Sequence, residues 1–170
     1  PQGEHLVKIS ASIHFQNGVF VNQVETIMDY GLLKTAKVIR DFLTVDNISP
    51  TDPLPVKFAA GNAIVALDTL TSVTCYGHSV FLLEMEGKHP LLDPMFGPEA
   101  SPFSFVGQRY AYQQPFDLEQ FSKIDAVIIS YDHLEYPSIV ILQPHVGHFF
   151  VPLGVGAHLM RWGVAEDKIT

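Results

Sequence analysis

The sequence has little cysteine, few basic residues and no long apolar run. Its one cysteine, Cys75, excludes an intramolecular disulfide framework and any cysteine-rich zinc site. Ten basic residues against 18 acidic ones give a formal net charge of −8. That balance argues against a nucleic-acid-binding protein, which needs a basic surface. The apolar runs fall well short of the ~20 residues of a membrane-spanning helix, so no transmembrane segment is expected.

The residues that are present indicate a folded domain. Hydrophobic residues make up 47% of the 170 residues, which is enough to build a sizeable core and excludes general disorder. The first residues show neither a basic region nor an apolar region typical of a secretory signal. Together with the single cysteine, this favours a cytoplasmic location.

Residues 1–57 are predicted to form an N-terminal arm. Asn17-Gly18 lies between short apolar stretches and predicts a hairpin turn. Apolar residues then recur at three- to four-residue spacing, which predicts an amphipathic helix over about residues 25–43. The members of this stripe are Ile27, Leu32, Ala36, Ile39 and Leu43. Three prolines within residues 47–55 indicate a linker.

Residues 58–170 predict a domain of the α/β class. Three short strands and the turn at Glu86-Gly87 suggest a meander, followed by a long loop over residues 94–114. A near-continuous apolar run is typical of a strand buried on both faces, and strand and helix then alternate. The predicted strands cover residues 73–76, 80–84, 89–93, 124–130 and 148–153, and the predicted helices begin at Pro137 and Gly156. Cys75 lies inside an apolar strand and is expected to be a buried, inert thiol.

The strongest chemical signal follows the buried strand 124–130. Asp132 and His133 are neighbours in the loop after that strand, and ligands of α/β sheets bind just outside such strand ends. A carboxylate and an imidazole suit zinc, although such a pair is also common as a loop cap beside a surface histidine.

Five passages, in order along the chain, resemble the metallo-β-lactamase superfamily, and specifically the branch of ascorbate-6-phosphate lactonases and N-acyl-phosphatidylethanolamine phospholipases D. They are residues 14–20, 74–83 with Gly77-His78-Ser79, 91–96 with Asp93-Pro94, 124–130 and 149–158. The resemblance implies an αββα sandwich. It assigns residues 58–170 to the N-terminal half of that sandwich, with further metal ligands supplied by a C-terminal half.

The chain departs from the family motif His-x-His-x-Asp-His. An ungapped alignment keeps only His133 as a ligand and puts Glu135 in the place of the aspartate. An alignment with a three-residue gap after Ser130 matches Asp132 and His133 to the second half of the motif and keeps the following residues in register. We favour the gapped alignment because it explains more residues with one event.

The resemblance implies a role for each candidate site residue. Asp132 and His133 would bind the second metal ion, and Asp132 would also steer the attacking water. Asp93 would accept a hydrogen bond from a ligand histidine and orient it, although an aspartate before proline is also a common turn cap. His78 and His158 are weaker candidates for the substrate side. His78 is equally well explained as a structural histidine, and for His158 the substrate-side role is the less favoured interpretation.

The expected function is hydrolysis of an ester, lactone or phosphodiester by a metal-activated water. The resemblance implies two zinc ions per intact site, with manganese or iron as alternatives, and a small-molecule or lipid-like substrate. The competing hypothesis is a non-catalytic homologue that serves as a binding or structural module, because the His-x-His half of the motif is absent. A third hypothesis is a half-domain that forms a homo-oligomer to complete its sheet.

Overall fold

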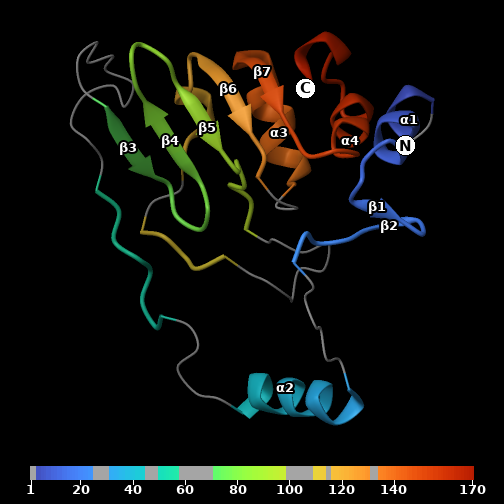
Figure 1. Ribbon diagram of the computed structural model, residues 1–170. Helices are drawn as coiled ribbons and strands as arrows, with labels where there is room; N and C mark the ends of the chain where they lie inside the picture. The colour runs from blue at the N-terminus through green and yellow to red at the C-terminus, as the bar shows by residue number, and fades with distance from the viewer. Residues whose placement is uncertain are drawn as a thin grey trace.

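The computed structural model describes residues 3–24, 31–44, 50–57, 71–98, 109–113, 116–130 and 134–170. The α-helices are α1 (Glu4–Ser10), α2 (Leu32–Thr44), α3 (Tyr136–Leu142) and α4 (Gly156–Arg161). The strands are β1 (Phe15–Gln16), β2 (Val19–Phe20), β3 (Ser72–Cys75), β4 (Phe81–Glu84), β5 (Pro90–Leu92), β6 (Ile124–Ile128) and β7 (Val146–Phe150). Figure 1 shows these elements along the chain.

Five strands form one sheet in the order β3-β4-β5-β6-β7. The pairs β3–β4 and β4–β5 are antiparallel, whereas β5–β6 and β6–β7 are parallel. The predicted meander and the predicted change to a parallel layer are therefore both present. The chain returns from β6 to β7 through α3, which lies behind the sheet in Figure 1. This mixed sheet with helices confirms the α/β class.

The helix-covered face of the sheet forms the core. Paired residues of four adjacent strands lie in one fully buried row, namely Leu82, Leu91, Val127 and Phe149. Ile139 and Leu142 of α3 and Leu159 of α4 belong to the same buried cluster. The α3 helix presents this apolar stripe because residues three apart share a face of a helix.

The opposite face of the sheet is also apolar. Pairing across all five strands aligns Cys75, Phe81, Leu92, Ile128 and Phe150 in a row. Phe150 keeps 46% of its surface exposed, and Val73 on the same face keeps 61%. A sheet that is apolar on both faces is suited to lie between two layers, as in an αββα sandwich. The expectation that Cys75 is buried is wrong: the thiol is exposed, because alternation along β3 directs it to this face.

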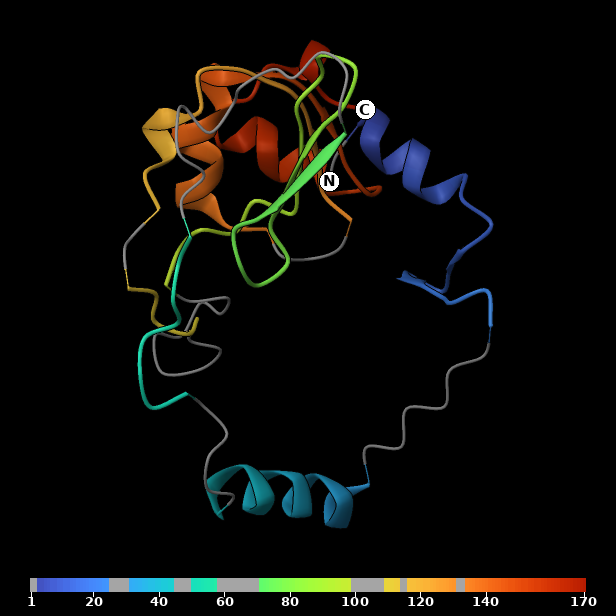
Figure 2. The ribbon, with the colours of Figure 1, turned by 90° about the vertical axis from the view of Figure 1, so that its left-hand side faces the viewer.

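The arm is partly as expected. Asn17 and Gly18 form the turn between β1 and β2 with positive φ angles of 53° and 84°. In the predicted helix over residues 25–43, residues 25–30 lie outside the described residues, and α2 begins at Leu32. Figure 2 shows α1 beside the α/β layer and α2 set apart from it. Domain boundaries at residues 57 and 58 stay a prediction.

Asp125 anchors the edge of the sheet at which β5 and β6 begin. Its carboxylate accepts hydrogen bonds from the backbone N–H of His89 at 2.9 Å and lies 3.0 Å from Lys123 Nζ. Burial alone would raise the pKa of Asp125, but the hydrogen bonds from Lys123 and His89 outweigh it and lower the pKa to about 2. The unfolded pKa is higher, so ionised Asp125 stabilises the fold above about pH 4, and this contribution is lost as the pH falls towards 2.

Asp125→Asn is therefore expected to lower the free energy of unfolding at pH 7 by about 1 kcal/mol, after allowance for solvent screening. The difference from wild type should shrink as the pH falls from about 4 to 2. Urea unfolding at several pH values measures it, with the exposed Asp167→Asn as the matched control. A difference that does not change with pH would contradict this role of the ionised carboxylate.

Candidate functional site

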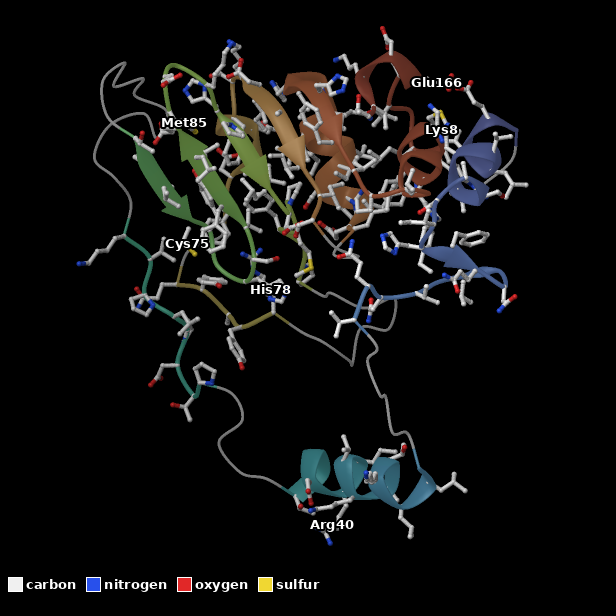
Figure 3. The ribbon with its side chains drawn as sticks, viewed as in Figure 1. Lys8, Arg40, Cys75, His78, Met85 and Glu166 are labelled. Atoms are coloured by element: carbon white, nitrogen blue, oxygen red, sulfur yellow. The ribbon has the colours of Figure 1, made fainter. Side chains whose placement is uncertain are left out.

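Four strand ends meet at one edge of the sheet. Because β3, β5, β6 and β7 run in the same direction, their carboxyl ends share this edge. His78 follows β3, Asp93 follows β5 and Ser130 follows β6. Figure 3 shows His78 at this end of the sheet. Ligand sites of α/β sheets form in this position.

Asp93 joins the end of β5 to the end of β6. One carboxylate oxygen accepts a hydrogen bond from Ser130 N at 2.7 Å, and the other accepts one from Ser130 Oγ at 2.6 Å. The backbone N–H of Asp93 donates to the Ile128 carbonyl at 2.9 Å. Asp93 is buried and has a φ angle of 45°, a left-handed conformation that aspartate tolerates better than most residues. It therefore fixes the chain directly before residue 131.

Glu135 fixes the chain on the other side of residues 131–133. It is the N-cap of α3, and its carboxylate accepts hydrogen bonds from Ser138 N at 3.2 Å and from Ser138 Oγ. The same carboxylate oxygen accepts a bond from Gly97 N at 3.2 Å, while Ser138 Oγ accepts one from Phe96 N at 3.0 Å. A Cβ atom at residue 97 would collide with Glu135 Oε1, so a larger residue there would displace the carboxylate.

The loop of residues 93–97 thus holds both flanks of the segment that carries Asp132 and His133. Asp93 binds the entering residue, and Phe96 and Gly97 bind the start of α3 through Ser138 and Glu135. Asp132 and His133 themselves lie outside the described residues. The described contacts thus fix the backbone on both sides of residues 131–133, at the carboxyl end of β6. We call these contacts the frame.

Arg109 ties this loop to the β3–β4 turn. Its guanidinium donates to the Met95 carbonyl at 2.9 Å and to the carbonyls of Tyr76 and Gly77. Aromatic rings surround it, with centroids 5.1 Å away at Tyr112, 5.2 Å at Phe116 and 5.9 Å at Phe96. A cation that lies close to the face of an aromatic ring is attracted by the negative potential of that face. Tyr76 packs in the same cluster, where burial, with a smaller contribution from Glu84, raises the pKa of its hydroxyl.

The two weaker candidates, His78 and His158, lie on different parts of the described structure. His78 is exposed in the β3–β4 turn, with a φ angle of 52°. His158 is exposed on α4, where its ring centroid lies 6.2 Å from that of Trp162. His158 lines an apolar pocket of about 390 Å³ between α4 and the arm, together with Leu6, Ile9, Phe15, Phe20, Leu153 and Val155.

A metal centre needs three or more suitable donors, and the described residues contain no group of three His, Cys, Asp or Glu side chains placed to hold an ion. Both oxygens of Asp93 already accept bonds from Ser130. Asp132 and His133, which follow β6 in the sequence, stay predicted ligands.

Comparison with known proteins gives a family match over the second half of the chain. A model described as a beta-lactamase superfamily domain matches residues 90–170. These residues contain β5 to α4, and therefore Asp93, Ser130, Asp132, His133 and Glu135.

Several curated proteins are similar over more of the chain. An uncharacterised protein of Mycobacterium tuberculosis is 33% identical over 162 residues, which are 93% of this chain and 44% of the relative. A Mycobacterium bovis protein matches to the same extent. The N-acyl-phosphatidylethanolamine-hydrolyzing phospholipase D 1 of Caenorhabditis elegans is 28% identical over 77% of this chain and 35% of its own length. The chain spans less than half the length of the curated relatives it matches.

Among solved structures, the crystal structure of CmlA, a diiron beta-hydroxylase from Streptomyces venezuelae, is similar with a TM-score of 0.44 and 20% identity. The match covers 59% of this chain and 20% of that one.

Proposed function

Because this chain belongs to the metallo-β-lactamase superfamily, in the branch that includes the N-acyl-phosphatidylethanolamine phospholipases D, we propose that the protein is a metal-dependent hydrolase. The observation that carries the proposal is the frame around residues 131–133. Asp93 and Glu135 hold both flanks of this segment at a sheet edge suited to ligand binding. Hydrogen bonds around a metal-binding segment help to orient its ligand side chains.

Asp132 and His133 are the residues that would hold a metal in this chain, and Asp132 is also the proposed catalytic residue. When bound, zinc, manganese or iron would lower the pKa of a water ligand and polarise the scissile carbonyl or phosphoryl group. Asp93 would keep Ser130, and so the start of the ligand segment, in place. The remaining ligands would come from residues that the described structure does not bring to this edge.

The proposed substrate class is an ester, a lactone or a phosphodiester, as a small molecule or a lipid. The Caenorhabditis elegans relative is named for hydrolysis of N-acyl-phosphatidylethanolamine. His78 lies at the same sheet edge, and the pocket beside His158 is mostly apolar. These features support a substrate that combines a polar scissile group with an apolar part.

A second function has an observation in its favour. The His-x-His part of the family motif is absent from residues 124–136, and the described residues hold no three-donor group. A homologue that retains the fold as a binding module would show both features. The metal-dependent hydrolase requires a bound metal ion, whereas the binding module does not.

The test is hydrolysis by the full-length protein before and after chelation. Assayed substrates are an aryl ester, a γ-lactone, a phosphodiester and N-acyl-phosphatidylethanolamine. We expect turnover of at least one class, its loss with EDTA, and its return when zinc or manganese is added back. Turnover that survives complete removal of metal would contradict the proposal, and absence of turnover with every class would favour the binding module.

A further inference from the structure

Helix α2 has an apolar surface that no part of the described chain covers. It spans Leu32–Thr44, and both Figure 1 and Figure 2 show it apart from the sheet and its helices. On this surface Leu32 is 90% exposed and Ile39 56%, while Leu33 and Val38 are exposed on other sides of the helix. Large exposed apolar patches mark interaction sites, because burial of such surface is favourable.

The polar residues of α2 gather on the other side. With about 100° between successive residues, Leu32, Ala36 and Ile39 fall on one stripe. Lys34, Lys37 and Asp41 fall on the opposite side, and Arg40 lies at the boundary. The helix has three basic residues and one acidic residue, whereas the whole chain has a formal net charge of −8. Positive charge is thus concentrated on a helix that also exposes an apolar stripe.

The apolar stripe and the basic residues of α2 together suit a partner that has an anionic surface and an apolar interior. We propose that α2 lies along the surface of an anionic lipid bilayer, with Leu32, Ala36 and Ile39 among the acyl chains and with Lys37 and Arg40 at the headgroups. Its 13 residues make a helix of only ~20 Å, shorter than the ~30 Å bilayer core. Among the described residues, no helix meets the length and hydropathy required to cross a membrane. The Arg40–Asp41 ion pair at 2.7 Å is exposed and opposes the attraction only weakly.

Flotation of the full-length protein with vesicles tests the proposal. The vesicles are phosphatidylcholine alone or mixed with phosphatidylglycerol. We expect the protein to float with the mixed vesicles, to float less at high salt because salt screens the headgroup attraction, and to float little with phosphatidylcholine. This outcome does not depend on hydrolysis, so it stands or falls separately from the proposed function.

Two variants and a matched control identify the helix as the contact. Lys37→Glu with Arg40→Glu should reduce vesicle partitioning about tenfold or more, and Leu32→Ser with Ile39→Ser should reduce it on neutral and anionic vesicles alike. Lys57→Glu with Arg161→Glu changes the net charge equally at exposed residues outside α2 and should retain binding. Unchanged thermal unfolding shows that each variant is folded.

Two results would overturn the proposal. One is wild-type protein that floats with neither vesicle. The other is equal binding by the α2 variants and the control. A wild-type dimer that Leu32→Ser with Ile39→Ser converts to monomer, without vesicle binding, would assign the bare face to a second copy of the chain.

Discussion

Replacement of Asp93 by alanine is expected to lower the free energy of unfolding by about 4–7 kcal/mol. The change removes both hydrogen bonds from Ser130 to a carboxylate, which contribute about 1.5–3 kcal/mol each. It also puts alanine at a φ angle of 45°, which adds about 1 kcal/mol of strain. Urea unfolding of wild type and variant measures the loss.

Asp93→Asn is the matched control for this prediction. Asparagine tolerates the left-handed conformation and retains one oxygen acceptor, so its effect should be less than half as large. Ser130→Ala should produce an intermediate loss, because only the bond from Ser130 Oγ disappears. A stability of Asp93→Ala close to that of wild type would show that the joint between β5 and β6 is not needed for the fold.

Replacement of either Asp132 or His133 by alanine is expected to reduce metal-dependent turnover of the full-length protein by about a hundredfold or more. Each change removes a proposed ligand from a segment whose flanks stay fixed by Asp93 and Glu135. Stability should change little, because the supporting bonds are untouched. Initial rates and thermal unfolding of the same preparations separate loss of function from loss of fold.

Asp167→Ala and His145→Ala supply the controls of the same residue types. Asp167 lies in the 3₁₀ turn Glu166–Lys168, and His145 lies before β7, away from the carboxyl ends of the parallel strands. Both controls should retain full turnover. Equal turnover in wild type and in the Asp132 and His133 variants would remove these residues from the proposed site.

Much of the sheet follows from short-range patterns. The apolar run that begins at Ile124 predicted a strand, and β6 covers Ile124–Ile128. The turns at Asn17-Gly18 and Glu86-Gly87 were predicted from their residue types, and all four residues have positive φ angles. Element ends were less accurate: β7 begins at Val146, two residues before the predicted start, because pairing with β6 extends it.

The contacts around the candidate site were harder to predict. The position of Asp93 followed from the family resemblance, but its bonds to Ser130 join residues 37 positions apart. Glu135 and Arg109 were missed because they bind backbone groups, which leave no residue-type pattern in a sequence. An acidic residue just before a helix start is favourable, and Glu135, two residues before Pro137, could have been identified as the cap by that signal.

The metal content of the full-length protein, purified without chelator and measured by inductively coupled plasma mass spectrometry, tests the central claim most directly. We predict about two ions of zinc, manganese or iron per chain, and markedly fewer in Asp132→Ala and His133→Ala. A wild-type protein that carries no metal, and that takes up none when zinc is supplied, would contradict a metallohydrolase and identify the fold as a binding module.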